Sequence, residues 1–68
     1  MEIIVNGEKR RAADGLNLAG LLDELGFGEK RVAVELNLEI LPRDRHAGYR
    51  LRDGDRLEIV QAIGGGAD

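Results

Sequence analysis

The sequence has no cysteine and no tryptophan, and it has only one phenylalanine, one tyrosine, one histidine and one proline. The lack of cysteine excludes disulfides and thiolate metal sites, which fits a reducing compartment. A net charge of −3 and the scarcity of aromatic rings argue against a nucleic-acid surface, which needs a concentrated basic excess and stacking side chains. We therefore expect neither a metal nor a nucleic-acid partner.

The chain also lacks a long apolar run. Residues 1–7 have no basic region followed by an apolar stretch, so they predict neither a signal peptide nor a membrane span. We expect a soluble, cytoplasmic protein with no membrane partner. A chain of 68 residues forms one domain, and a domain of this size buries only about 60% of the surface that its unfolded chain exposes. The fold must therefore be regular and economical.

The N-terminal residues predict a β-hairpin. Residues 2–5 are rich in β-branched side chains, and Asn6-Gly7 suits the positive φ angles of a type I′ turn. A second strand should return over residues 8–12. Its charged residues are typical of an edge strand protected against aggregation, and we prefer that interpretation to a docking site.

One amphipathic helix is predicted over residues 18–25. Its leucines follow the i, i+3, i+4, i+7 spacing that places them on one face: Leu18, Leu21, Leu22 and Leu25. Asn17 is a suitable N-cap, and Gly26 is a suitable residue to end the helix in the left-handed conformation. Gly20 costs about 1 kcal/mol relative to alanine inside a helix, so the helix needs a sheet to pack against.

The second half of the chain predicts three more strands. Residues 31–36 alternate apolar and polar, which indicates a half-buried strand, and residues 39–42 form a short strand stopped by Pro42. A polar, irregular connection follows over residues 43–50. The turn Asp53-Gly54-Asp55 then leads into the final strand, residues 57–63.

These elements predict an α+β fold of the β-grasp, ubiquitin-like type. A mixed sheet of four to five strands should be covered on one face by the single helix, because the leucine stripe and the inward strand residues need each other. The first and last strands are the most aliphatic, so we expect them side by side at the centre. The domain should span residues 1–63, with a flexible glycine-rich tail over residues 64–68.

Some conspicuous residues have ordinary interpretations. His46 lies in a polar loop, where a lone histidine is more often solvated than catalytic or metal-bound. Asp53 and Asp55 flank a turn glycine, which aspartate favours for its own reasons. The glycines at 64–66 do not form a phosphate-binding loop, because no helix follows them. We find no catalytic residue.

Several segments spread over almost the whole chain form a specific combination. They are Asn6-Gly7, the helix ending at Gly26, Val-Ala-Val-Glu-Leu-Asn at 32–37, Ile-Leu-Pro-Arg at 40–43, residues 51–60 and Ile-Gly-Gly-Gly at 63–66. Together they resemble the ThiS family, the sulfur carriers of thiamine biosynthesis. The small subunit of molybdopterin synthase shares the fold and a Gly-Gly end, but it is generally longer.

The resemblance implies a carrier that enzymes act on and that binds no cofactor itself. A ThiF-like adenylyltransferase would use ATP to activate the terminal glycine carboxylate, and a cysteine-desulfurase-derived source would supply sulfur to form a thiocarboxylate. Thiazole synthase would then receive the sulfur for the thiazole ring. The functional pair implied here is Gly65 and Gly66. The alternatives are a noncovalent ubiquitin-like interaction module, or a carrier for another pathway such as molybdopterin synthesis.

The chain departs from the family pattern after Gly66, where Ala67 and Asp68 follow. Three explanations compete: a protease trims the tail, the two residues are foreign to the natural protein, or the carrier role has been lost. We favour trimming by a protease, which makes the chain the precursor of a carrier.

Partner enzymes should contact the final strand and the approach to the tail, because the tail is positioned by what it is attached to. The expected partner-binding residues are Ile4, Glu58, Val60, Gln61, Ala62, Ile63 and Gly64. If Ile3 and Leu57 face the helix, Ile4 and Val60 face away and would form a small exposed apolar pair. Ordinary apolar surface is an equally good interpretation of that pair.

Overall fold

The computed structural model describes residues 1–28 and 30–61. Its strands are β1 (Glu2–Val5), β2 (Glu8–Arg11), β3 (Val32–Leu36), β4 (Glu39–Leu41) and β5 (Arg56–Gln61), and its helices are α1 (Leu18–Glu24) and the short 3₁₀ turn η1 (Arg43–Arg45). Every predicted strand is present within one or two residues of its expected bounds. The last two residues of the predicted final strand and the predicted tail lie outside the described residues.

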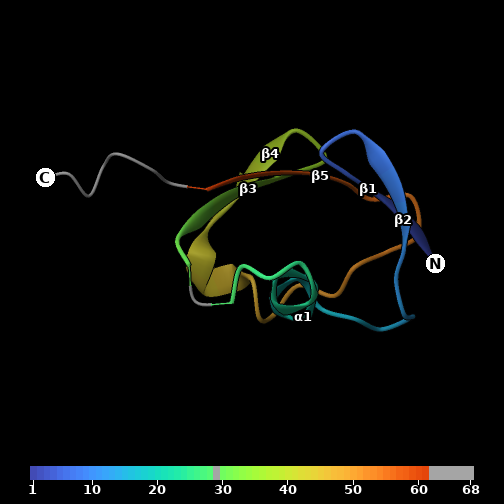
Figure 1. Ribbon diagram of the computed structural model, residues 1–68, viewed down its shortest axis with the longest axis horizontal. Helices are drawn as coiled ribbons and strands as arrows, with labels where there is room; N and C mark the ends of the chain where they lie inside the picture. Colours follow the sequence, from blue (N-terminus) through green and yellow to red (C-terminus); the bar gives the residue numbers. More distant parts are fainter. Residues whose placement is uncertain (29, 62–68) are drawn as a thin grey trace, which may run out of the picture.

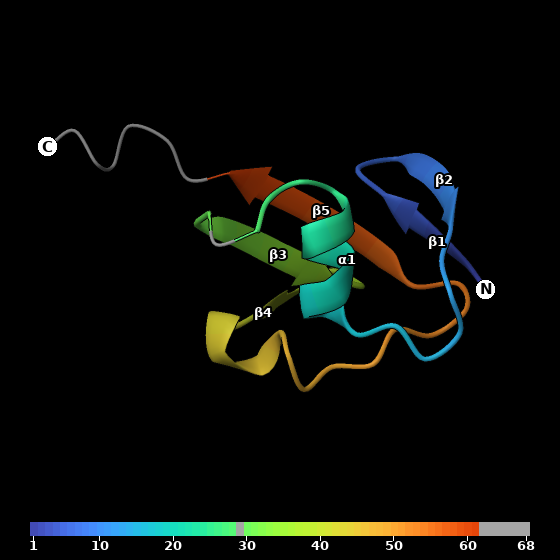
Figure 2. The same ribbon diagram turned by 60° about the horizontal axis from the view of Figure 1, so that its bottom comes forward.

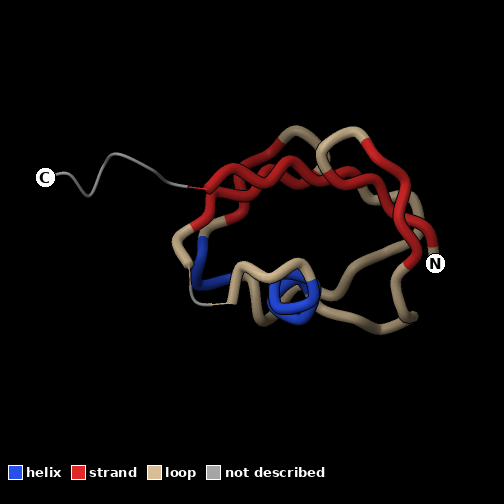
Figure 3. Tube along the Cα trace, viewed as in Figure 1, coloured by secondary structure: helices blue, strands red, loops and turns tan. Residues whose placement is uncertain are grey.

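The strands form one mixed sheet in the order β2-β1-β5-β3-β4. β1 and β5 are parallel, and the other neighbouring pairs are antiparallel. The first and last strands are therefore side by side, as predicted, with β5 in the middle. The helix α1 packs across one face of the sheet, and no other described element covers the opposite face (Figures 1 and 3). The predicted α+β, β-grasp fold is confirmed.

Both ends of α1 are capped as the sequence indicates. The Asn17 side chain accepts a hydrogen bond from the backbone N–H of Gly20 at 2.8 Å. At the other end, Gly26 has φ +90°, and its N–H and that of Phe27 donate to the carbonyls of Asp23 and Leu22 at 3.0 and 2.9 Å. This double hydrogen bond is the Schellman motif, which satisfies carbonyls that the helix leaves free.

The glycine inside the helix has a structural reason. A Cβ atom at Gly20 would lie 2.8 Å from the Leu16 Cδ1 atom and 2.9 Å from the Asn17 Oδ1 atom. Leu16 and the capping oxygen therefore occupy the space that an alanine methyl group would need. The lower helix propensity of glycine is offset by the intact cap.

The core lies between α1 and the sheet. Its buried apolar side chains are Ile3, Leu18, Leu21, Leu22, Val34, Leu51, Leu57 and Ile59. The connection that follows η1 joins this core, because the Leu51 N–H donates to the Leu16 carbonyl and the Leu18 N–H donates to the Tyr49 carbonyl, both at 2.9 Å. Leu51 is part of the buried core, and Tyr49 is partly buried and packs against it.

Candidate functional site

The candidate site is the segment that follows β5 in the sequence. The expected thiocarboxylate residues Gly65 and Gly66 lie outside the described residues, as do Ala62, Ile63 and Gly64. The structure describes the strand that leads to them. β5 lies between β1 and β3 in the sheet, and it runs from the end of the domain where the N-terminus lies to the opposite end (Figure 2).

An asparagine in the first hairpin turn binds β5 on its β1 side. The chain leaves β1 at Asn6, which has φ +51°, so β1 has no backbone left to pair with the second half of β5. The Asn6 side chain takes over, since its Oδ1 atom accepts from the Ile59 N–H at 2.7 Å and its Nδ2 atom donates to the Ile59 carbonyl at 3.2 Å. The amide thus replaces two backbone groups of a strand.

A second turn asparagine binds the start of β5 on its β3 side. Asn37, with φ +52°, accepts from the Arg56 N–H at 3.0 Å through Oδ1 and donates to Asp55 Oδ1 at 3.1 Å through Nδ2. The sequence indicated Asn6 only as a turn residue and did not indicate these side-chain contacts for either asparagine. The signal for their second role is the choice of asparagine where glycine would also fit the turn.

Asp55 is a buried carboxylate at the entrance to β5. Besides Asn37, it accepts from the Tyr49 hydroxyl at 2.7 Å and from the Arg52 N–H at 2.9 Å. Burial alone would raise the pKa of Asp55, but these hydrogen bonds outweigh it and lower that pKa. Burial and the contact with Asp55 raise the pKa of Tyr49 to about 12. Asp55 therefore does more than the turn-forming role that the sequence suggested.

Side chains of β5 alternate between the two faces of the sheet. Leu57 and Ile59 are buried under α1, whereas Glu58, Val60 and Gln61 are exposed. The expected partner-binding residues of β5 are thus accessible. We call the uncovered side the open face; the register and strand alternation assign to it Ala33 and Glu35 of β3, Ile40 of β4, and Glu58 and Val60 of β5.

The predicted pair of Ile4 and Val60 is wrong. Ile4 is half-buried and not fully exposed. The register places Ile4 opposite Arg56, whereas Val60 lies four residues further along β5 and opposite Ala33. The two side chains share a face of the sheet but are not cross-strand neighbours. The sequence could not supply this register, which depends on where β1 stops.

Two exposed apolar residues, Leu38 and Ile40, were not expected from the sequence. Leu38 is 83% exposed, Ile40 is 72% exposed, and Val60 is 62% exposed. Leu38 also has φ +74° in the turn between β3 and β4, a conformation that favours glycine and disfavours leucine. The alternation of residues 39–41 could have indicated that Ile40 faces away from the core.

Two glutamates lie directly opposite each other on the open face. The register pairs Glu35 with Glu58, and it also pairs Glu35 with Ile40 on its other side. Both glutamates are exposed, and among residues 1–28 and 30–61 neither forms a salt bridge. Like charges in this position destabilise a sheet. The pair therefore has no evident purpose in the folding of the isolated chain.

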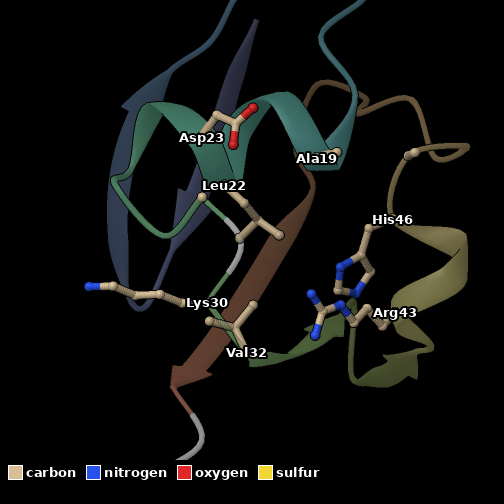
Figure 4. A pocket seen from close by; sticks show the side chains of 9 residues that line it. Ala19, Leu22, Asp23, Lys30, Val32, Arg43 and His46 are labelled. Atoms are coloured by element: carbon tan, nitrogen blue, oxygen red, sulfur yellow. The ribbon is translucent and has the colours of Figure 1, made fainter.

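The expectation of a solvated His46 is wrong. His46 is 6% exposed, and its Nε2 atom lies 3.1 Å from the Leu41 carbonyl, to which it must donate because a carbonyl only accepts. The ring lines a shallow pocket of about 200 Å³ between α1, the start of β3 and η1. Figure 4 shows the Arg43 guanidinium beside this ring and Lys30 directed away from it. The contacts of His46 tie η1 to the fold.

The described part of the chain contains no group of three or more histidine, cysteine, aspartate or glutamate residues placed to hold a metal ion. Within the same residues, no helix has both the length and the apolar character needed to cross a membrane.

Comparisons with known proteins agree with the observed fold, and the family match also includes the three glycines at 64–66. The sequence model of the ThiS family matches residues 3–66. The crystal structure of the thiamine biosynthesis protein ThiS from Geobacter metallireducens superposes with a TM-score of 0.82 and 36% sequence identity, covering 97% of this chain and 100% of that one.

Curated relatives fall into two sizes. The sulfur carrier protein ThiS of Escherichia coli is 32% identical over 66 residues, which are 97% of this chain and 100% of the relative. A thiazole synthase of Paramagnetospirillum magneticum is 47% identical over 68 residues, which are 100% of this chain. This chain spans only 21% of the length of that thiazole synthase.

Proposed function

The chain belongs to the ThiS family, and we propose that it carries sulfur for thiamine biosynthesis as a thiocarboxylate on Gly66. As a carrier it is acted on by enzymes and catalyses no reaction itself. The observation that carries the proposal is the family match, which extends through Gly66 and stops there. The match to the whole length of the Escherichia coli sulfur carrier supports the same assignment.

The proposed chemistry begins with removal of the residues that follow Gly66. Hydrolysis of the bond between Gly66 and Ala67 by a protease adds water and gives Gly66 a free carboxylate. A ThiF-like adenylyltransferase then joins this carboxylate to the α-phosphate of ATP and releases pyrophosphate. Activation is needed because a carboxylate is a poor acyl donor, whereas AMP is a good leaving group.

Sulfur enters in the second step. A sulfide equivalent, delivered from a cysteine-desulfurase-derived source, attacks the activated carbon and displaces AMP, which leaves a thiocarboxylate on Gly66. Glycine suits this position because it brings its carboxyl carbon into a narrow site without a Cβ atom. Gly65, the preceding residue, offers the same slim backbone at the entrance to that site.

We propose thiazole synthase as the acceptor of the sulfur. The support is the Paramagnetospirillum magneticum relative, in which the equivalent of this chain is part of a thiazole synthase. This observation favours thiazole formation over molybdopterin synthesis as the destination. The exposed residues Glu58, Val60 and Gln61 of β5 lead towards Gly66 and are the described part of the surface that these enzymes would contact.

The first test is the intact mass of the protein purified without a C-terminal tag from its native cells. We expect a mass that lacks Ala67 and Asp68, with a fraction in which one oxygen is replaced by sulfur. The matched test in vitro compares the chain ending at Gly66 with the chain ending at Asp68, each incubated with ATP, sulfide and the activating enzyme. Sulfur incorporation into the untrimmed chain would contradict the trimming step.

Replacement of Val60 by aspartate tests the contact surface. Val60 is 62% exposed, so Val60→Asp should leave the thermal unfolding midpoint nearly unchanged. It should weaken capture by the activating enzyme, because a charge is placed on apolar surface next to the tail. Unchanged binding would remove Val60 from the contact surface.

A further inference from the structure

The first hairpin turn combines a reactive dipeptide with a structural contact. The chain has asparagine at positions 6, 17 and 37, and only Asn6 is followed by glycine, whereas leucine follows the other two. Glycine has no side chain to shield its backbone nitrogen, so this nitrogen reaches the side-chain amide of a preceding asparagine more easily than the nitrogen of leucine does. Asn6 is also the residue that binds Ile59 of β5 through both polar atoms of its amide.

The reaction that this dipeptide permits is deamidation, one reason why asparagine is a thermolabile residue. The Gly7 backbone nitrogen attacks the side-chain amide carbon of Asn6, and the new C–N bond closes a cyclic succinimide. The side-chain nitrogen takes up the proton of the Gly7 N–H and leaves as ammonia. Water then opens the ring at either carbonyl carbon, which gives aspartate or isoaspartate. The net change consumes water and replaces an NH₂ group by an OH group.

The folded structure opposes the first step of this reaction. The Asn6 Oδ1 atom accepts from the Ile59 N–H at 2.7 Å, and the Nδ2 atom donates to the Ile59 carbonyl at 3.2 Å. These two bonds hold the amide against β5, whereas ring closure turns the amide carbon towards the Gly7 nitrogen. The nitrogen that must leave is also the one that donates to Ile59. The amide therefore has to leave β5 before the ring can close.

Water, in contrast, has open access to the turn. Asn6 and Gly7 are both exposed. Apart from its chain neighbours, no heavy atom of the described residues lies within 4 Å of the place that a Cβ atom would take at Gly7. Hydrolysis of the succinimide is thus unhindered, and the folded chain controls the reaction at the release of Asn6 from Ile59.

We propose that Asn6 is a site of spontaneous deamidation and that opening of its contact with Ile59 sets the rate. When opening and closing are faster than ring closure, the rate follows the population of the open form. Either product lacks the N–H group that donates to the Ile59 carbonyl, and isoaspartate also adds an atom to the main chain of the turn. The reaction therefore removes a contact that holds β5. This proposal does not depend on the proposed function, because it concerns the strand and not the sulfur chemistry.

The first test incubates the full chain in mildly alkaline buffer and follows deamidation by peptide mapping. Trypsin cleaves after lysine and arginine, so the three asparagines fall in separate peptides: residues 1–9, 12–30 and 32–43. Each peptide reports one asparagine, and a sample digested before incubation corrects for deamidation during digestion. We expect the mass gain of deamidation to accumulate in the first peptide well before it appears in the other two.

The second test measures the opening independently, by hydrogen exchange at the Ile59 amide. Urea below the unfolding transition should accelerate this exchange and the deamidation of Asn6 by the same factor. Leu57→Ala, which weakens the packing of β5, should accelerate both by about tenfold or more. The matched control Val60→Ala changes an exposed residue of the same strand and should alter neither rate. The urea series decides the question if Leu57→Ala does not fold.

The reacted chain provides a third test. Deamidation adds a negative charge, so ion exchange separates the reacted chain from the original one. The reacted chain should exchange the Ile59 amide faster than the original chain does, because it has lost part of the contact.

Four results would overturn the proposal. They are equal deamidation at the three asparagines, an Asn6 rate that stays constant when exchange at Ile59 accelerates, a rate in the folded chain equal to that in concentrated urea, and unchanged exchange at Ile59 after deamidation.

Discussion

The two faces of the sheet are built for different purposes. On β5, Leu57 and Ile59 are buried beneath α1, while Glu58 and Val60, which alternate with them, face solvent. The neighbouring strand β3 shows the same difference. Val34 lies opposite Ile59 on the covered face, and Glu35 lies opposite Glu58 on the open face. The stability of this small domain therefore comes from one side of a single layer of strands, and the other side is free to serve partners.

The largest expected effect compares two residues of the same strand. Leu57→Ala should lower the free energy of unfolding by about 2–5 kcal/mol, because it leaves a cavity under α1. Val60→Ala should change it by no more than about 0.5 kcal/mol, because Val60 is exposed. Urea unfolding of both variants measures the difference. Equal losses would show that the open face contributes to stability as much as the covered one.

The next effect concerns the buried carboxylate at the entrance to β5. Asp55→Asn should lower the free energy of unfolding by about 2 kcal/mol at neutral pH, because hydrogen bonds to a charged acceptor are replaced by weaker ones. The pKa of Asp55 is lowered in the folded chain. Its contribution is therefore complete above the unfolded pKa of about 4 and is lost as the pH falls through the folded value.

The measurement is urea unfolding of the original chain and the Asp55→Asn variant from pH 7 downwards. The difference between them should shrink in acid, once Asp55 is protonated in the folded chain. Asp23→Asn on the exposed side of α1 is the matched control and should show no such trend. A difference that stays constant with pH would mean that the charge of Asp55 does not stabilise the fold.

A smaller effect is expected at the edge of β5. Asn6→Gly keeps the positive φ angle of the turn but removes both side-chain hydrogen bonds to Ile59. We expect a loss of about 1–2 kcal/mol and faster hydrogen exchange at the Ile59 amide. Asn6→Asp retains the acceptor for that amide, so it should protect the amide better than glycine does. Equal exchange in the original chain and in both variants would show that the Asn6 side chain does not protect the Ile59 amide.

The smallest effect has the opposite sign. Leu38→Gly should raise the free energy of unfolding by about 0.5–1 kcal/mol, because glycine relieves the left-handed backbone at φ +74° and Leu38 buries little surface. Leu38→Ala keeps the strained backbone and should bring no such gain. Thermal unfolding of the two variants decides this. A loss of stability in Leu38→Gly would show that the Leu38 side chain stabilises the turn.

Local patterns predicted the covered face well. The leucine spacing of α1, the cap at Asn17 and the glycine at position 26 are decided by neighbouring residues, so the sequence was sufficient for them. The adjacency of β1 and β5 also followed, because the most aliphatic strands occupy the centre of a sheet. The parallel direction and the register of that pair depend on where each strand ends in space.

The open face and the polar contacts were harder to predict for the same reason. Glu35 and Glu58 become neighbours only through the register of β3 and β5, which are separated by a long connection. The burial of His46 and the hydrogen bonds of Asp55 likewise join residues from different elements. The sequence showed that these regions are polar, but it did not show which residues form hydrogen bonds with one another.

The central position of β5 has a consequence for how the protein is made. Asn6 and Ile59, which bind each other, are 53 residues apart, and contacts this distant in sequence form late in folding. During synthesis the ribosome completes β1, β2, β3 and β4 before the strand that joins them. A chain interrupted before β5 therefore lacks the middle of its sheet, so the sheet is completed only once the strand that leads to the glycines has been made.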